Sequence, residues 1–394
     1  MPNSVTLKTN IPEALAHLLQ AAQNTVQHAL VEAAQTDSSD SFPQKTLAEI
    51  TNAHLLTASA SSKYGGADLG LLPGTNFALL TILKHIGSGN LVMGRVLEGH
   101  INAQLLIHQF GTEEQQECFA KDAFAGKLFG VWNTQANDGT WLSEREGEVH
   151  LLSGAKTFAT GTGYVTRPII TAALPNGAWQ MCVVPLDAVA AEIDDSWWNP
   201  MGMKASRSYK MTFENAPIST DNLLGAPDSY YQQPAFSGGA VRFAAVQLGA
   251  AERLLEETRT YLRSLGRTDD PYQNMRVGQM TIAVTSGNQW LQGAAEQLDI
   301  YMTDATPENS ERFLLYANMM RTAIEQICVD IMALCQKCVG ARGLNKPYHF
   351  ERIIRDLSTY LRQPAPDAAL ADVGRYMMHT DVPAGEFWNE GNEV

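Results

Sequence analysis

The hydrophobic periodicity of the chain changes twice, and these two changes constrain the fold more than any single motif does. Up to about residue 124, apolar residues recur at helical intervals in 11–35, 47–60, 75–86 and 91–110. Short β-rich runs bounded by Gly, Pro, Asn or Asp follow, from about Gly126 to Pro227. Helical spacing returns at Pro234. This order predicts a helical domain, a β domain and a second helical domain.

We therefore expect an α+β protein whose domains can be bounded from the pattern. A chain of 394 residues is long enough for a sizeable core divided among two or three domains. The central β domain has the short strands of a small sandwich or barrel, and the long helices after it favour a four-helix bundle. The expected divisions are an N-terminal helical domain, the β domain, the bundle and a tail, at 1–124, 125–230, 231–380 and 381–394.

The charge of the chain excludes two classes of partner. Its 42 acidic and 28 basic side chains give a net charge of -14, which opposes binding to nucleic acid or to an anionic membrane surface. An anionic ligand would need a local basic pocket. No run of about 18 apolar residues occurs, and the N-terminus is polar, so we expect a soluble, cytoplasmic protein.

The five cysteines are few and scattered, so we do not expect a disulfide framework. Cys335 and Cys338 have the spacing of a CxxC motif, but they fall inside a helical pattern without a second CxxC or a histidine pair. We expect buried helix residues here and no metal site.

The stretch from Gly340 to Asp367 follows a long apolar-periodic run and contains the densest group of unusual residues. Gly340 and Gly343 permit positive φ or a close approach of backbone to a ligand. A charged segment around Arg355 and Asp356 comes next. From these residues alone, the stretch is a helix C-cap followed by a solvated charged helix.

Five motifs then occur in a fixed order: Tyr64–Gly70, Phe110–Gln115, Ser153–Lys156, Trp198–Lys204 with Phe213–Asn215, and the glycine loop with Arg355–Asp356. Together they resemble the acyl-CoA dehydrogenase superfamily, and the resemblance runs from about residue 60 to 378. It implies the fold order predicted above and an FAD cofactor. It also implies a homodimer or homotetramer, because a neighbouring subunit completes the flavin site in that family.

The resemblance assigns the flavin ring to three residues of the β domain. Thr134 matches a threonine whose hydroxyl bonds the ring edge. Phe158 and Thr160 match an aromatic-x-Thr sequence that lies against the ring. For Thr160, a β-branched residue that simply fills a strand is an equal alternative.

Three further residues are implied at the phosphate end of the cofactor. Arg267, with Arg263 as a substitute, matches an arginine on the pyrophosphate, and guanidinium suits phosphate through bidentate hydrogen bonding. A solvated helix cap is the alternative for Arg267. Gly340 and Gly343 would bring backbone N–H groups near the ADP portion.

The catalytic base is where the chain departs from the family. A Glu-Gly pair supplies the base in common dehydrogenases, and counting from Arg355–Asp356 puts Pro364 and Ala365 there. Some relatives carry the glutamate at the start of the first bundle helix instead. That position does not supply a base here, because 237–242 contains no carboxylate. The weak candidates are Asp367, otherwise a helix cap, and Arg242, whose place in an apolar run needs an anionic partner. A structural ion pair and a contact with an anionic substrate both remain open for Arg242.

Three functional hypotheses follow. The first is an FAD-dependent oxidoreductase that acts on a CH–CH bond next to a thioester-type carbonyl, with hydride transfer to flavin, an acyl-CoA as possible substrate and a separate electron acceptor. The second is a flavin-dependent monooxygenase supplied by a flavin reductase, which needs no α-proton base. The third is a non-catalytic flavin-binding or scaffold relative. The first is the leading expectation, the missing glutamate favours the second, and the catalytic residue is unknown.

Overall fold

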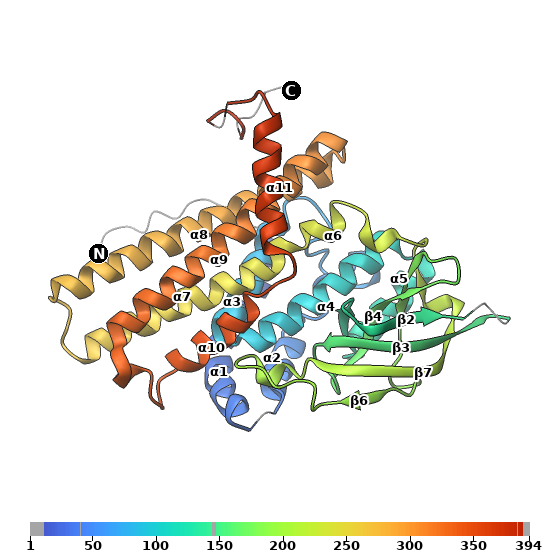
Figure 1. Ribbon diagram of the computed structural model, residues 1–394, viewed down its shortest axis with the longest axis horizontal. Helices are drawn as coiled ribbons and strands as arrows, with labels where there is room; N and C mark the ends of the chain where they lie inside the picture. The colour runs from blue at the N-terminus through green and yellow to red at the C-terminus, as the bar shows by residue number, and fades with distance from the viewer. Residues whose placement is uncertain (1–11, 40, 144–146, 384, 389–394) are drawn as a thin grey trace.

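The computed structural model describes residues 12–39, 41–143, 147–383 and 385–388. Its elements run from helices to strands and back to helices, and the sheet lies at one side of the molecule while the long helices extend away from it (Figure 1). The α+β fold class predicted from periodicity is confirmed. The N-terminal helices are α1 (Glu13–Ser39), α2 (Gln44–Asn52), α3 (Asn76–Gly89), α4 (Leu91–Phe110) and α5 (Glu113–Phe124).

The central strands form a single hydrogen-bonded sheet in the order β6-β7-β3-β2-β4-β5-β8, with β1 pairing parallel to β4. In the part of the chain that the structure describes, this order has β6 and β8 at its ends, so the strand pairing does not close into a barrel. β2 joins β4 through the single pair Trp141–Ala173. The strands are β1 (Leu128–Trp132), β2 (Gln135–Leu142), β3 (Val149–Ala159), β4 (Val165–Ala173), β5 (Trp179–Val183), β6 (Glu192–Asp194), β7 (Tyr209–Ser219) and β8 (Leu223–Leu224).

Three long helices, α7, α8 and α9, run side by side in the C-terminal bundle (Figure 1). Proline in the first turn and a side-chain cap begin two of them: Asp270 caps α8, and Thr306 caps α9. The charged segment after α9 is divided into two shorter helices. The elements are α6 (Ala235–Gly238), α7 (Ala240–Ser264), α8 (Pro271–Thr303), α9 (Pro307–Gly343), α10 (Phe350–Tyr360) and α11 (Pro366–His379).

The bundle packs directly on the N-terminal helices through a close contact between α3 and α7. A Cβ atom on Gly249 of α7 would lie 2.0 Å from the carbonyl oxygen of Lys84 on α3. The two backbones can therefore approach only because residue 249 has no side chain.

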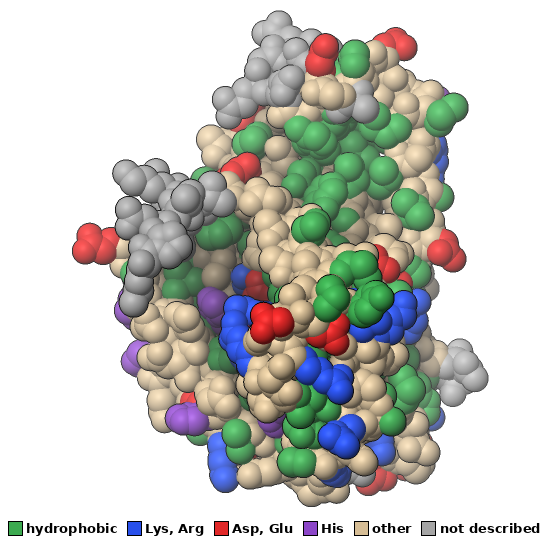
Figure 2. Space-filling model, turned by 90° about the vertical axis from the view of Figure 1, so that its left-hand side faces the viewer, with side chains coloured by type: hydrophobic (Ala, Val, Ile, Leu, Met, Phe, Trp, Pro, Cys, Tyr) green, Lys and Arg blue, Asp and Glu red, His purple; other side chains and the backbone are tan. Residues whose placement is uncertain are grey.

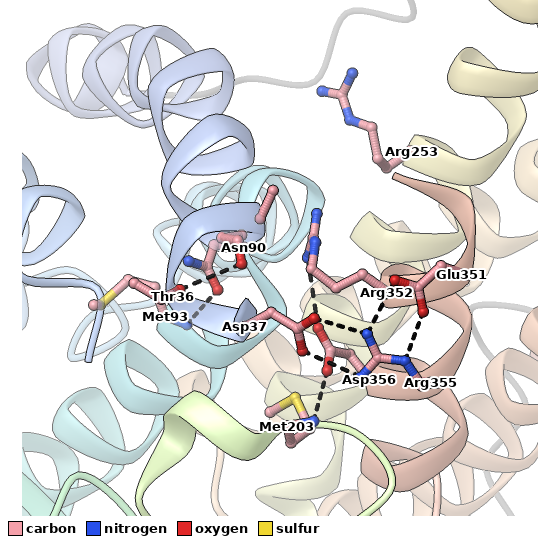
Figure 3. A network of polar contacts seen from close by, with 12 residues as sticks. Thr36, Asp37, Asn90, Met93, Met203, Arg253, Glu351, Arg352, Arg355 and Asp356 are labelled. Atoms are coloured by element: carbon pink, nitrogen blue, oxygen red, sulfur yellow. Dashed lines mark hydrogen bonds and ion pairs between the residues drawn. The ribbon is translucent and has the colours of Figure 1, made fainter. Parts of the chain in front are cut away.

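A polar junction joins the loop after β6 to α10 and α1 (Figure 3). Asp356 accepts a hydrogen bond at 2.6 Å from the backbone N–H of Met203, which has a φ of 59°. A Cβ on the preceding Gly202 would lie 2.1 Å from the carbonyl oxygen of Arg355. Arg355 itself reaches Asp37 at the end of α1. The Arg-Asp pair of the sequence motif thus fixes the β domain against the bundle.

Among the described residues, no helix is long and apolar enough to cross a membrane. The same part of the chain contains no group of His, Cys, Asp and Glu side chains that could hold a metal ion. Cys335 and Cys338 are both buried in α9, as the helical pattern predicts.

Candidate active site

A small cavity lies where α4 passes the edge of the sheet. One wall comes from Arg95, Val96 and Gly99 of α4, and the opposite wall comes from β1, from Phe129 to Trp132. Thr160 and Val165, on either side of the turn between β3 and β4, close it. Apart from Arg95 and the hydroxyl of Thr160, the lining side chains are apolar.

Trp132 and Thr160 hold the sheet side of this cavity in place. The indole Nε1 of Trp132 donates to the carbonyl oxygen of Thr160 at 3.0 Å. The Thr160 hydroxyl lies 2.9 Å from the hydroxyl of Ser208, which precedes β7. Because Thr160 has tertiary hydrogen bonds and lines the cavity, its position is more specific than that of a residue filling a strand.

Phe158 forms an exposed aromatic surface beside the cavity. Its side chain is 49% exposed, although its ring meets Trp197 and Trp198 edge to face at 4.8 and 5.9 Å. Its φ of 54° is a rare conformation for an aromatic residue, and such backbone strain concentrates at functional sites. Thr134 is exposed at the end of β1, and its carbonyl oxygen accepts a hydrogen bond from the N–H of Thr157.

The other three residues predicted to bind the cofactor lie elsewhere. Arg267 is exposed in the turn between α7 and α8, at the end of the bundle away from the sheet (Figure 1). Gly340, with a φ of 58°, interrupts α9, and Gly343 ends it. Tyr261 of α7 contacts the backbone of Val339 and the ring of Tyr348, so the ends of α7 and α9 are adjacent. The predicted cofactor residues thus form two separate groups in one chain.

A buried polar network, which the sequence analysis missed, begins at the cavity wall. Glu98 of α4 is 2% exposed and pairs with Arg95, one turn earlier on the same helix. The amide of Asn102 donates to Glu98, and its oxygen accepts from the Nε of Arg242 on α7. Glu98 and Arg95 stand three residues apart inside an apolar helical run. That internal charge pair is the signal that could have found them.

The network perturbs several protonation equilibria. Burial lowers the pKa of Arg242, and the Glu98 carboxylate only partly offsets this effect. For Arg95 burial acts in the same direction, but Glu98 outweighs it and the pKa rises. Burial also raises the pKa values of Tyr230 and Tyr360, whose rings stand beside this network. Both phenols therefore remain hydrogen-bond donors at neutral pH.

Pro364 and Ala365, which counting along the sequence sets at the family's Glu-Gly pair, lie in the turn between α10 and α11. Pro364 is exposed, and its carbonyl oxygen accepts a hydrogen bond from Arg321 at 2.9 Å. Ala365 has φ 52° and ψ 49°, the left-handed geometry that favours glycine. Asp367 is exposed in the first turn of α11, where the helix dipole stabilises a carboxylate.

Two family models match this chain. The acyl-CoA dehydrogenase N-terminal domain matches residues 12–127, and the acyl-CoA dehydrogenase C-terminal domain matches 241–362. The two segments together span more than half of the chain. The protein belongs to the acyl-CoA dehydrogenase superfamily.

Curated relatives divide between two activities. A dibenzothiophene monooxygenase of Rhodococcus erythropolis is 23% identical over 342 residues, which are 78% of this chain and 81% of the relative. A short-chain-specific acyl-CoA dehydrogenase of Clostridium acetobutylicum is also 23% identical, over 82% of this chain and 86% of the relative.

Solved structures show the same division. FMN-bound TdsC from Paenibacillus sp. A11-2 superposes with a TM-score of 0.84 at 18% identity, covering 94% of this chain and 100% of TdsC. Butyryl-CoA dehydrogenase from Megasphaera elsdenii gives 0.81 at 17% identity, with 94% and 99% covered. At these identities the structures support the fold and leave the activity to the site.

Proposed function

We propose that this protein is a flavin-dependent monooxygenase, which uses reduced flavin and dioxygen to oxygenate a small molecule. The observation that carries the proposal is that, among the described residues, no free carboxylate is found at the counted position of the family's glutamate or at the cavity wall. The turn at 364–365 has no carboxylate, and Glu98, the carboxylate beside the cavity, is already bonded by Arg95 and Asn102. A dehydrogenase must remove an α-proton, whereas oxygenation by a reduced flavin does not require that step.

The residues around the cavity suit a flavin. When bound, the cofactor would supply the electron transfer or oxygen chemistry that no side chain provides. The exposed ring of Phe158, with Trp197 behind it, offers an apolar surface on which a planar ring can lie. Thr160 and Thr134 would direct hydroxyls to its polar edge.

A second copy of the chain would supply the phosphate end of the site, through Arg267, Gly340 and Gly343. Exposed apolar side chains support this association: Tyr272 and Ile282 of α8 are each 69% exposed, and hydrophobic residues gather on this side of the molecule (Figure 2). The family resemblance implies FAD, whereas TdsC is FMN-bound. Mass spectrometry of the released cofactor distinguishes the two.

Acyl-CoA dehydrogenation, on a CH–CH bond beside a thioester, is the second candidate. The left-handed conformation of Ala365, which glycine adopts most easily, is compatible with it, because the sequence count puts the glycine of a Glu-Gly pair at this position. A base would then have to come from another residue.

The test compares two ways of reducing and oxidising the flavin. Protein loaded with FMN or FAD is mixed with butyryl-CoA under nitrogen, and the visible flavin band should persist. In parallel, NADH and a flavin reductase supply reduced flavin under ¹⁸O₂, with dibenzothiophene, indole and benzenesulfinate as probes. We expect one ¹⁸O atom in a product and a lower yield of hydrogen peroxide. Bleaching by butyryl-CoA without ¹⁸O incorporation would instead establish the dehydrogenase, and failure to bind flavin would support the scaffold hypothesis.

Replacement of Pro364 by Glu tests directly whether the missing glutamate is what prevents dehydrogenation. If the pocket is built for another substrate, Pro364→Glu will not create reduction by butyryl-CoA. A gain of activity would mean that the pocket still accepts the thioester and would count against the monooxygenase. Pro364→Gln is the matched control, since the glutamine side chain has nearly the same shape as glutamate but carries no charge.

A further inference from the structure

The geometry of the buried network points to an anionic substrate: we propose that Arg242 and Arg95 bind a carboxylate, sulfonate or sulfinate group of a small organic molecule. This inference rests on the proposed function, since it names the class of substrate for the network that begins at Arg95 on the cavity wall. Of the two roles that the sequence leaves open for Arg242, a structural ion pair and a contact with an anionic substrate, the proposal takes the second.

The first argument is charge balance. Two guanidinium groups, Arg95 and Arg242, share one buried carboxylate, Glu98. The described residues include an ion pair for Arg95 and none for Arg242, whose Nε donates instead to the neutral oxygen of Asn102. The network therefore carries one excess positive charge, in a protein with a net charge of -14. This is the local basic pocket that an anionic ligand would need.

The second argument is the state of the donors. Within the described residues, the two terminal nitrogens of Arg242 make no hydrogen bond. A guanidinium is less costly to bury when its fork of donors meets an oxyanion, which can accept two parallel hydrogen bonds. Nη2 lies 3.0 Å from the position of a Cβ on Gly239, so a larger residue there would crowd this donor.

The third argument is an independent one from Tyr360. Its side chain is 5% exposed, and its hydroxyl oxygen faces the Arg95 guanidinium, while its O–H donates to no acceptor within the described residues. Buried polar groups are nearly always paired, so an unpaired one needs an explanation such as a ligand. The charges of Arg95 and Glu98 both act on this phenol, which places it at the network. A phenol donor beside the Arg95 guanidinium is complementary to an oxyanion.

The apolar walls of the cavity indicate what the rest of the ligand is like. Val96, Val131, Val165 and Trp132 make the cavity walls largely apolar. The anionic group therefore belongs to an organic molecule with an apolar body, and a neutral acyl chain would leave Arg242 unpaired.

The test is equilibrium binding to the flavin-loaded, oxidised protein, measured by calorimetry without reductant. Benzoate and benzenesulfonate are compared with the neutral analogues benzamide and benzyl alcohol. A charged hydrogen bond predicts that the anions bind about 10-fold to 100-fold more tightly. Equal affinity for the neutral analogues would overturn the proposal. Since no turnover is involved, anion binding can succeed even if oxygenation fails, and the two proposals are tested separately.

Variants locate the site. Arg242→Met should remove the preference for anions and leave the affinity for benzamide unchanged, while Arg242→Lys should restore part of it. The control is Arg259→Met on the same helix, whose guanidinium pairs at the surface with Glu256. An unchanged anion preference in Arg242→Met would overturn the assignment.

A phosphate of the flavin is the other source of an oxyanion. Protein stripped of flavin is therefore titrated with FMN and with riboflavin. If Arg242→Met weakens both equally, the anion is not the cofactor phosphate, which supports an anionic substrate. A loss confined to FMN would overturn it.

Discussion

The guanidinium of Arg355 meets the carboxylate of Asp37 side by side, with its two terminal nitrogens 3.1 and 2.8 Å from the two oxygens. The residues are 318 positions apart in the chain, and the pair joins the end of α1 to α10. Arg355 also donates to Glu351 on its own helix and to the carbonyl oxygen of Met201 in the loop after β6. One side chain thus connects all three parts of the fold.

Asp37→Asn should lower the free energy of unfolding by about 1 to 2 kcal/mol, because a half-buried charged hydrogen-bonded pair is lost. Urea unfolding followed by circular dichroism measures the change. Asp372→Asn is the control, since Asp372 pairs with Arg375 at an exposed position and should change stability by less than about 0.5 kcal/mol. Similar losses in the two variants would show that the junction adds nothing beyond a surface pair.

Ala365→Gly should stabilise the protein, by about 0.5 to 1 kcal/mol. The left-handed conformation of residue 365 strains any residue with a Cβ, and this strain outweighs the extra entropy that glycine gains in the unfolded chain. Thermal unfolding measures the effect. Ala371→Gly, at an exposed helical position in α11, should destabilise by a similar amount. The same sign in both variants would contradict this explanation.

His100 should make stability depend on pH. It is fully buried: Nδ1 accepts from the N–H of Phe129, Nε2 donates to the carbonyl oxygen of Leu56, and burial lowers the pKa to about 4. Between pH 6.5 and 4 the unfolded chain binds a proton that the folded one does not. The contribution of neutral His100 is therefore present above pH 6.5 and declines as the pH falls toward 4, by about 3 kcal/mol in all.

Urea unfolding at a series of pH values checks this, with His100→Gln as the variant that cannot titrate. We expect the stability difference between the wild type and His100→Gln to shrink as the pH falls from 6.5 to 4. Parallel curves would show that the histidine does not titrate with the expected pKa.

Removing the charge of Glu98 and removing the charge of Arg242 should change the stability of the ligand-free protein by different amounts. Glu98→Gln leaves two guanidiniums without a buried carboxylate and should destabilise by about 3 kcal/mol or more. Arg242→Met removes the excess charge and should be close to neutral. Urea unfolding of the ligand-free proteins measures both. Greater destabilisation by Arg242→Met would identify Arg242 as part of the structural pairing.

Local signals in the sequence predicted much of the fold. The hydroxyl of Thr112 caps α5, a local signal that the sequence contains, and the regular part of α9 ends at Gly340, where the apolar-periodic run stops. The change from helix to strand near Gly126 follows from the change in period. These features depend on neighbouring residues, so a linear pattern contains them.

The site was harder to predict because it depends on contacts between distant segments. Arg242 and Asn102 are 140 residues apart, and no periodicity shows that α4 and α7 bring them together. Lys156 is in β3 and fully buried, with Nζ 3.1 Å from both the carbonyl oxygen of Asn133 and the hydroxyl of Thr171. The positive φ of Phe158 was equally hidden, because no glycine marks it.

The separation of Arg267 and Gly340 from the sheet has a consequence for handling the protein. A cofactor that needs both groups can be held only while two chains are associated, so dilution would weaken its binding even at a constant excess of flavin. Colour would then be lost with falling protein concentration, and added flavin would in turn drive the chains together.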